Sequence, residues 1–295
     1  MLRCHWRPET AEWEVWAPAK LNLFLEVLSK RADGYHELET LMTPINLYDI
    51  LYVREEAFSH IHFQCEPSAC GQLPTGGDNL VVRAVERLRQ HTGEQRGLSI
   101  RLVKRIPLAA GLAGGSSDAA AALVAACAVW NSPVSPEEVS SLAAQLGSDV
   151  PFFLQSEAAL CLGRGEIIRP VPRSRPLPVV VVRPAQGLST AQVFGACRPA
   201  SEPQSSQALV AALKAGNAAQ VGRLLHNRLW EPAARLCPEL VQLQKKFDQL
   251  DLLGHSMSGS GTSYFGICRS PAQARRAAAR LRSWEVGKVF VVHTR

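Results

Sequence analysis

Residues 104–130 read KRIPLAAGLAGGSSDAAAALVAACAVW, an extended run followed by a glycine-rich loop that opens directly into an alanine-rich helix. The loop contains three glycines, Gly111, Gly114 and Gly115. Because glycine has no Cβ atom, the backbone there can take positive φ and bring its N–H groups close to an anion. The polar residues that follow, and that offer capping oxygens to the helix, are Ser116, Ser117 and Asp118. With the partial positive charge of a helix N-terminus, the stretch predicts a phosphate-binding loop.

Other classes of glycine-rich loop fit this stretch less well. The Walker pattern G-x-x-x-x-G-K-[ST] is absent, because Gly115 is followed by Ser116 and Ser117 rather than by a lysine. A dinucleotide-binding loop needs an acidic residue about 20 positions later at the end of a second strand, whereas Glu137 and Glu138 fall inside an apparent helix start. These features disfavour a P-loop NTPase and an NAD-dependent oxidoreductase. A tight turn into a buried helix of small residues remains open as a purely structural alternative.

The composition is that of a globular protein. The chain has 295 residues, of which 46% are hydrophobic, enough for a full core in one large domain or two ordinary ones. Its longest apolar run, 119–130, is shorter than the roughly 20 residues that span a bilayer. The first residues mix acidic and basic side chains without an apolar stretch, so we expect no targeting peptide and a location in the cytoplasm.

Cysteines and charges narrow the range of partners. The cysteines are scattered without a C-x-x-C pair, which favours reduced core residues over a disulfide or zinc framework. They are Cys4, Cys65, Cys70, Cys127, Cys161, Cys197, Cys237 and Cys268. The net charge of +6 comes from dispersed arginines and suits an anionic small substrate better than a nucleic acid. We expect neither a nucleic-acid nor a membrane partner.

An alternating stretch near the N-terminus, 13–28, predicts a strand. Lys20 and Asn22 lie on the same side of it, two residues or about 6 to 7 Å apart, so their side chains are predicted neighbours. A lone lysine at a strand start is otherwise usually a solvated edge charge. The proline at position 18 and the asparagine beside the lysine make a shared polar site an equal alternative.

Two turns carry further candidate residues. Asp33-Gly34 favours a turn that presents Tyr35 and His36, a pair that would otherwise be ordinary surface residues. Asp149 follows a predicted helix end, where an aspartate is commonly only a turn former. Neither position identifies a site by itself.

The rest of the chain alternates between strands and helices. Strands are predicted at 41–54, 61–65, 98–103, 179–182, 264–268 and 288–293. Helices are predicted at 79–91, with Asp78 as N-cap, and at 206–228, 238–250 and 271–283. Ser135 begins a capping box before a helix that Gly147 ends. A proline-rich stretch at 170–178 predicts a domain boundary, and the elements after it predict an antiparallel or mixed sheet with helices on one face.

Three motifs in fixed order resemble the GHMP kinases, the family of galactokinase, homoserine kinase and mevalonate kinase. They are PAKLNLFLEV at 18–27, PLAAGLAGGSSDAAAAL at 107–123 and HSMSGSGTSYFG at 255–266. Within the family, RADGYHELETLM at 31–42 and GSDVPFFL at 147–154 resemble the members that act on a cytidine-diphosphate-linked methylerythritol. The resemblance spans nearly the whole chain.

The resemblance implies a two-domain α+β fold. The N-terminal domain, 1–170, would be similar to ribosomal S5 domain 2 and carry the ATP phosphate loop, and the C-terminal domain, 171–295, would be ferredoxin-like. It also implies an ATP-dependent kinase, using Mg²⁺, that phosphorylates the 2-hydroxyl of the cytidyl substrate in the non-mevalonate route to isoprenoid precursors. It assigns no metal ligands and is compatible with a homodimer.

The resemblance also implies roles for single residues. Asp149 would be the catalytic base and Lys20 its cationic partner. The substrate side would comprise Asn22, Tyr35, His36 and Phe194, the last three at the cytidine ring. The nucleotide side would comprise Asn79 and Lys104 near the adenosine and the loop residues Pro107, Leu108, Ala109, Ala110, Gly111, Leu112, Ala113, Gly114, Gly115, Ser116 and Ser117. The third motif, which would support this loop, contributes Ser258, Gly259, Ser260 and Gly261.

One departure and two competing functions accompany this assignment. Ala110 and Ala113 stand where the family often has glycine, so their methyl groups are expected to shift the loop slightly. A sibling kinase acting on mevalonate, homoserine or a sugar would share the loop but would have no use for Tyr35 and His36. A non-catalytic sensor of the same fold would need neither Asp149 nor Lys20.

Overall fold

The computed structural model describes residues 2–66, 73–74, 76–155, 157–172 and 175–295. They form two compact units, each assembled from several stretches of chain. The first comprises Met1–Ala19, Leu47–Leu108 and Ala113–Ser156, and the second comprises Lys20–Asn46, Ala109–Leu112 and Glu157–Arg295. The glycine-rich loop therefore contributes to both units. The domain boundary at 170, within a stretch that includes residues outside the described ranges, stays a prediction.

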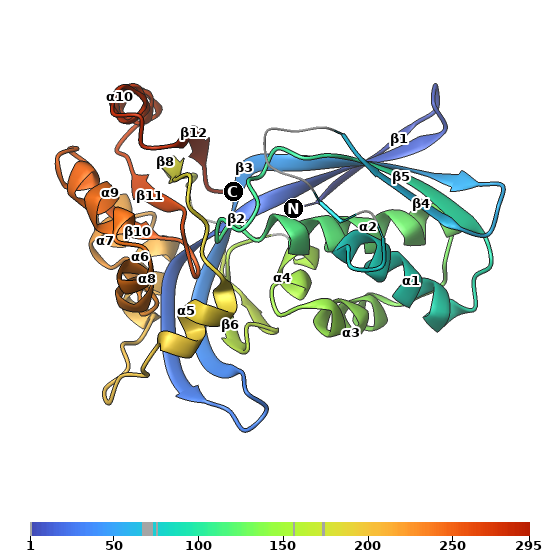
Figure 1. The fold of residues 1–295 in the computed structure, drawn as a ribbon, viewed down its shortest axis with the longest axis horizontal. Helices are drawn as coiled ribbons and strands as arrows, with labels where there is room; N and C mark the ends of the chain where they lie inside the picture. Colours follow the sequence, from blue (N-terminus) through green and yellow to red (C-terminus); the bar gives the residue numbers. More distant parts are fainter. Residues whose placement is uncertain (1, 67–72, 75, 156, 173–174) are drawn as a thin grey trace. The chain divides into compact units, whose positions relative to one another are not determined.

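The first unit combines a sheet with four helices. Its elements are β1 (Arg3–Arg7), the first part of β2 (Glu12–Lys30), the last part of β3 (His36–Glu56), β4 (Ile61–Cys65), α1 (Leu80–Thr92), β5 (Gly97–Val103), α2 (Gly114–Trp130), α3 (Pro136–Leu146) and α4 (Val150–Leu154). The strand order is β1-β2-β3-β5-β4, with β1 antiparallel to β2, β5 antiparallel to β3, and β4 parallel to β5. Figure 1 shows the four helices on one side of these strands.

Helix α2 is the central helix of this unit, as its alanine content predicts. Alanine has the highest helix propensity and a small side chain, so α1, α3 and α4 can all pack against it. The expected capping by Ser116, Ser117 and Asp118 is wrong, because the helix begins earlier, at Gly114, and these three residues lie inside it. Its N-cap is Ala113, in the left-handed region at φ 54°, without a side-chain capping bond.

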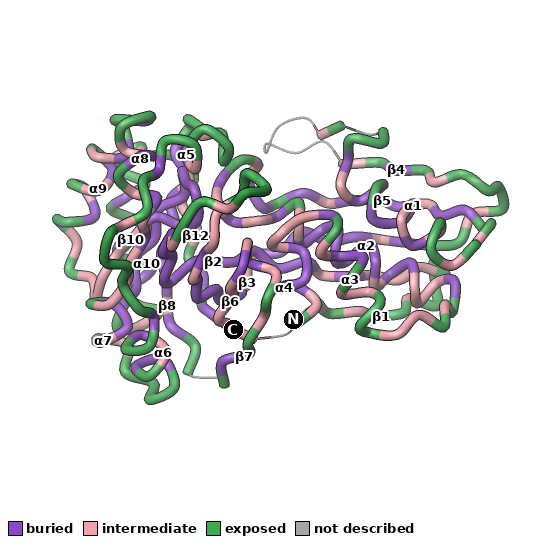
Figure 2. The backbone as a smooth tube through the Cα atoms, turned by 90° about the horizontal axis from the view of Figure 1, so that it is seen from below, coloured by how far each residue is buried: buried purple, intermediate pink, exposed green. Residues whose placement is uncertain are grey.

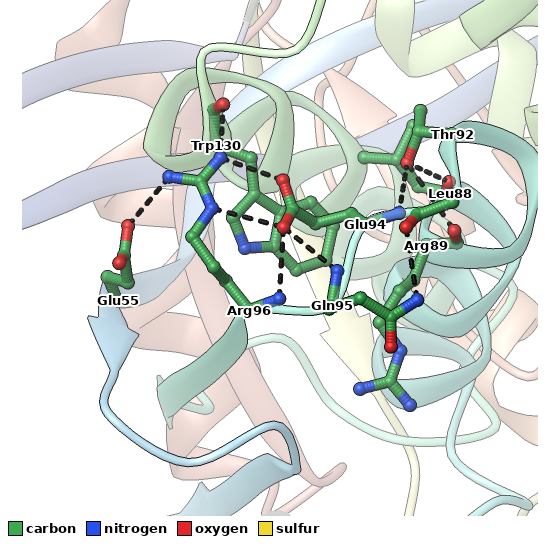
Figure 3. A network of polar contacts seen from close by, with 9 residues as sticks. Glu55, Leu88, Arg89, Thr92, Glu94, Gln95, Arg96 and Trp130 are labelled. Atoms are coloured by element: carbon green, nitrogen blue, oxygen red, sulfur yellow. Dashed lines mark hydrogen bonds and ion pairs between the residues drawn. The ribbon is translucent and has the colours of Figure 1, made fainter.

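A polar network closes the other end of α2 (Figure 3). Arg96 donates to the backbone oxygen of Trp130 over 2.6 Å and pairs with Glu94 and Glu55 over 2.7 and 3.0 Å. The bond from Arg96, together with bonds from nearby backbone N–H groups, lowers the pKa of Glu94 from 4.5 to about 2. The network therefore links the ends of β3 and α2 to the loop between α1 and β5.

The second unit contains a separate four-stranded sheet. The elements of the second unit are the remaining parts of β2 and β3, then β6 (Ala159–Gly163), β7 (Ile167–Pro170), β8 (Pro178–Arg183), α5 (Thr190–Ala196), α6 (Gln207–Lys214), α7 (Ala218–Arg223), β9 (His226–Asn227), α8 (Trp230–Leu236), α9 (Glu239–Asp248), β10 (Gly254–Met257), β11 (Tyr264–Ile267), α10 (Pro271–Ser283) and β12 (Lys288–His293). The sheet has the strand order β10-β11-β8-β12 and is antiparallel throughout. This confirms the antiparallel sheet predicted for the second half of the chain. The middle of β8 is buried (Figure 2), as is the whole of β11, and α10 packs against β8 and β12.

Two local predictions are wrong. The single helix expected at 206–228 is divided into α6 and α7, because Gly216 takes φ 66° and Asn217 caps a new helix start. Asp78 does not cap α1; the next residue, Asn79, does so by accepting a bond from the Val81 N–H. The capping box at Ser135 is confirmed.

Membrane and cysteine predictions can be compared with the described residues. None of their helices is long and apolar enough to cross a bilayer. The seven described cysteines are free thiols, of which Cys161, Cys197, Cys237 and Cys268 are buried. Cys70 lies outside the described residues.

Candidate active site

Lys20 and Asn22 form a buried polar pair on β2. Each is only 3% exposed. The Lys20 ammonium donates to Asn22 Oδ1 over 2.5 Å and to the backbone oxygen of Gly111 over 3.0 Å. The predicted adjacency of the two side chains is confirmed, and the lysine is not a solvated edge charge. Because the dielectric constant is low at buried sites, this fixed ammonium could stabilise a nearby negative charge strongly.

The backbone oxygens of residues 110–112 accept hydrogen bonds from the third motif and from Lys20 within the second unit. The Ser258 hydroxyl donates to the same Gly111 oxygen over 3.0 Å, and the Ser263 N–H donates to the Ala110 oxygen over 3.1 Å. The Lys20 N–H donates to the Leu112 oxygen over 3.1 Å. The three carbonyl groups of residues 110–112 therefore all accept hydrogen bonds from within the protein.

Asn227, which the sequence analysis did not single out, hydrogen-bonds the third motif. Its Nδ2 donates to the backbone oxygens of Met257 and Gly259 over 2.7 and 2.9 Å, and its Oδ1 accepts the Leu229 N–H. Ser260 bonds the hydroxyl of Thr190 over 3.0 Å. The short strand β9 brings Asn227 beside β2, a long-range pairing for which the sequence contains no local signal.

The start of α2 differs from the predicted backbone conformation. Positive φ, expected at Gly114 and Gly115, occurs instead at Ala109 and Ala113, with values of 47° and 54°. A Cβ atom on Gly114 would lie 2.9 Å from both Lys104 Nζ and Ile106 Cγ2, whereas one on Gly115 would meet only Leu80, at 3.8 Å. A side chain at Gly114 would therefore displace its neighbours, whereas one at Gly115 would make only an ordinary contact.

Lys104, predicted on the adenosine side, lies in a buried ionic group. Its ammonium contacts Asp49 Oδ2 over 2.5 Å and Asp118 Oδ2 over 2.6 Å, and the three side chains are at most 3% exposed. Burial opposes the charged form of the lysine, but the two aspartates more than offset it and raise the pKa of Lys104. Burial also raises the pKa of Asp118. Asp49 additionally accepts the N–H groups of residues 105 and 106, which ties β3 to the loop.

Asn79 and Asp149 both lie at helix starts of the first unit. The Asn79 amide caps α1 through its oxygen and donates to the Pro74 oxygen over 2.7 Å. Asp149 occupies the N-cap position of α4 at φ −85° and ψ −11°, without a side-chain capping bond, and is partly exposed. Helix capping by its side chain therefore does not account for the aspartate at this position.

The Asp33-Gly34 turn presents Tyr35 and His36 as predicted. Gly34 has φ 86°, and the Tyr35 side chain is 52% exposed with the Arg164 guanidinium 4.7 Å from its ring centroid. The His36 ring lies 5.4 Å from the Phe194 ring at an interplanar angle of 32°. Burial, with Lys30 nearby, lowers the pKa of His36, so the imidazole is neutral near pH 7.

Comparisons with known proteins identify the family. The GHMP kinase N-terminal domain model matches residues 79–157, and the C-terminal model matches residues 209–286. A 4-diphosphocytidyl-2-C-methyl-D-erythritol kinase of Pelotomaculum thermopropionicum is 46% identical over 268 residues, 90% of this chain and 92% of that protein. The chain belongs to the GHMP kinase family. A kinase of the same name from Thermus thermophilus is 42% identical over 270 residues, 91% of this chain and 92% of that protein.

Solved GHMP kinase structures share the fold. A crystal structure of 4-(cytidine 5'-diphospho)-2C-methyl-D-erythritol kinase is 40% identical, with a TM-score of 0.80 over 95% of this chain and 98% of that one. A homoserine kinase from Cytophaga hutchinsonii is 19% identical, with a TM-score of 0.75 over 97% and 96%. The predicted two-domain α+β fold of the GHMP kinases is therefore confirmed.

Proposed function

We propose that this chain transfers the γ-phosphoryl group of ATP to the 2-hydroxyl of 4-diphosphocytidyl-2-C-methyl-D-erythritol. The observation that carries the proposal is that relatives between 35% and 46% identical, aligned over about nine tenths of the chain, bear the name of this kinase. The homoserine kinase structure is only 19% identical and supports the fold alone. The sibling reactions are therefore weaker alternatives.

The start of α2 fits an ATP phosphate. Gly115 is exposed and lies in the first turn of a helix of 17 residues, where backbone N–H groups have no intrahelical partner. A Cβ atom at Gly115 would make a single ordinary contact, with Leu80 at 3.8 Å, so an anion could approach the backbone there. Lys104, in contrast, is bound to two aspartates inside the unit. We therefore assign Lys104 to holding the loop rather than to contacting the nucleotide.

Magnesium fits this site only together with ATP. The described residues contain no group of three or more His, Cys, Asp or Glu side chains that could hold a metal ion. Mg²⁺ commonly keeps several waters and binds through substrate phosphates plus one or two carboxylates, so it needs no cage made only of protein. Of the candidate carboxylates, Asp118 is buried beside Lys104 and Asp149 is partly exposed. When bound, the ion would neutralise charge on the transferred phosphate.

Asp149 and Lys20 carry the proposed proton and charge chemistry. An alcohol is a weak nucleophile until a base accepts its proton, and we assign that role to Asp149. Lys20, held by Asn22 and Gly111, would stabilise the negative charge that develops on the attacking oxygen. The support for these roles is the motif resemblance together with the geometry of each residue within its own unit.

The turn at Tyr35 and His36 carries the proposed selectivity for the cytidyl group. Aromatic rings stack on bases without distinguishing them, whereas a neutral imidazole offers one donor and one acceptor to the base edge. Phe194 completes the proposed aromatic surface beside His36. An NAD-dependent oxidoreductase or a ligand sensor has no comparable support from this set of residues.

The decisive experiment offers the protein Mg-ATP with each of four acceptors: the cytidyl-methylerythritol compound, mevalonate, homoserine and galactose. We expect ADP release above background with the cytidyl compound alone. Turnover of another acceptor would replace the proposal with a sibling reaction, and no turnover of any would favour the sensor. The cytoplasmic location and the homodimer remain proposals, which cell fractionation and sedimentation would test.

A further inference from the structure

Thr40, a residue of β3 to which no role was assigned above, lies beside the Lys20 and Asn22 pair. It is 3% exposed, like both of them. Its hydroxyl donates to the backbone oxygen of Phe24 over 2.7 Å, and the Asn22 Nδ2 group donates to its Oγ1 over 2.8 Å. Asn22 Oδ1 in turn accepts from the Lys20 ammonium over 2.5 Å. The three side chains thus form a continuous buried chain of hydrogen bonds.

The donor and the acceptor of each of these hydrogen bonds follow from the chemistry of the groups involved. A carbonyl oxygen can only accept, so the single hydroxyl proton of Thr40 must point to Phe24. The Thr40 oxygen is then left as an acceptor, and only the NH₂ side of the Asn22 amide can bond to it. The amide oxygen is thereby turned toward Lys20. A flipped amide would place its NH₂ group against the ammonium, two donors facing each other in a buried site.

The other neighbours of the Asn22 side chain do not set its orientation as strongly. The Ser258 hydroxyl lies 3.5 Å from Asn22 Oδ1 but donates over the shorter distance of 3.0 Å to Gly111. Its contact with the amide is therefore at the limit of a hydrogen bond. The 2.8 Å bond to Thr40 is the contact that distinguishes the two ends of the amide.

We propose that Thr40 is a positioning residue that orients the Asn22 amide and, through it, holds the Lys20 ammonium in place for phosphoryl transfer. The kinetic part of this inference rests on the proposed kinase function. The structural part, the link from Thr40 to Asn22, does not. The two parts are therefore tested with separate measurements.

Three substitutions separate positioning from packing. Thr40→Val keeps the shape and removes the hydroxyl, and Thr40→Ser keeps the hydroxyl. Thr43→Val is the matched control, because Thr43 lies on the same strand, is 2% exposed and donates to the Pro44 oxygen over 3.4 Å, outside the chain of bonds.

The structural measurement is hydrogen exchange of the Asn22 side-chain amide by NMR, assigned through the loss of its signal in Asn22→Asp. We expect slow exchange in the wild type, Thr40→Ser and Thr43→Val, and exchange at least tenfold faster in Thr40→Val. Equal exchange in Thr40→Val and Thr43→Val would overturn the link, whether or not the protein turns over substrate.

The kinetic measurement compares kcat and KM at a temperature where all variants are folded. Because small misplacements of a reacting group are costly, Thr40→Val should lower kcat by on the order of 10-fold to 100-fold, with little change in the KM for ATP and recovery in Thr40→Ser. In an Asn22→Ala background, Thr40→Val should have no further effect on kcat. A full additional loss in that background would mean that Thr40 acts independently of Asn22, contrary to the proposal.

Discussion

Gly111 lies so close to Ser258 that a Cβ atom on the glycine would stand 2.1 Å from the Ser258 backbone oxygen. The glycine also has φ 71°, so both its conformation and its surroundings exclude a side chain. Through this contact the glycine-rich loop and the third motif support each other within the second unit.

The contact predicts a specific cost for Gly111→Ala. Gly93 is a matched control, because it has the same φ of 71° and no described atom within 4 Å of its virtual Cβ. Gly93→Ala should therefore lower the free energy of unfolding only by the cost of the left-handed backbone, about 1 to 2 kcal/mol. Gly111→Ala should cost about 1 to 3 kcal/mol more in the free energy of unfolding, measured in urea, and should also lower kcat. Equal costs would mean that the loop moves away from Ser258 without penalty.

The proposed base makes a second prediction. Asp149→Asn keeps the shape of the side chain and removes the proton acceptor, so kcat should fall by on the order of 10² to 10⁴ while ATP affinity barely changes. Asp78→Asn, at an exposed position of the same unit, should leave kcat unchanged. The measurements are steady-state kinetics and calorimetry with a non-hydrolysable ATP analogue. A near-normal kcat in Asp149→Asn would remove this residue from the mechanism.

The two glycines at the start of α2 predict different outcomes for the same substitution. Gly115→Val should fold, since a Cβ atom added there would have Leu80, at 3.8 Å, as its nearest neighbour. It should weaken binding of the ATP analogue at least tenfold, because the side chain would fill the space proposed for the phosphate. Gly114→Val would collide with Ile106 and Lys104, so its first effect should be on stability. Thermal unfolding and calorimetry of both variants check this. Unchanged affinity in a folded Gly115→Val would place the phosphates elsewhere.

Sequence patterns predicted well what depends on near neighbours in the chain. The alanine-rich helix, the capping box at Ser135 and the adjacency of Lys20 and Asn22 all follow from local spacing, and the structure contains each of them. The Asp78 error was a choice between adjacent capping residues, which local pattern alone does not resolve.

Long-range pairing explains what the sequence could not predict. One of the two aspartates that bind Lys104, Asp49, lies 55 residues earlier in the chain, and Asn227 contacts the third motif across 30 residues or more. Both positions depend on which strands become neighbours. Of the two aspartates that bind Lys104, only Asp118 lies in the same stretch of sequence, so the buried ionic group could not be predicted from that stretch alone, and the nucleotide role of Lys104 stays a prediction.

The Glu94 network predicts a dependence of stability on pH. Because the pKa of Glu94 is lowered from 4.5 to about 2 in the folded state, its stabilising effect is full well above 4.5 and is lost as the pH falls toward 2. The difference in urea midpoint between the wild type and Glu94→Gln should therefore be largest near pH 7 and shrink below pH 4.5. Glu55→Gln, which removes the other carboxylate on Arg96, serves as the control. A difference that stays constant down to pH 3 would contradict this assignment.

The last prediction concerns selectivity for the cytidyl group. Tyr35 is half exposed and should stack on the base, so Tyr35→Ala should weaken cytidine and uridine analogues together, by about 1 to 3 kcal/mol. His36 is neutral near pH 7 because burial lowers its pKa, and its donor and acceptor can read the ring edge. His36→Ala should therefore narrow the gap between the two analogues, since a site built to bond one pattern of donors and acceptors rejects the other.

Competition assays with the cytidyl substrate and a uridyl analogue separate the two roles. Phe58→Ala is the control, because Phe58 is an aromatic side chain that is 71% exposed and belongs to the other unit. Loss of the Phe194 ring should resemble His36→Ala in part, because that ring supports the imidazole at 5.4 Å. If neither Tyr35→Ala nor His36→Ala changed the KM for the cytidyl compound while the KM for ATP rose, the turn would serve the nucleotide donor. The choice of this substrate over those of the sibling kinases would then rest on the relatives alone.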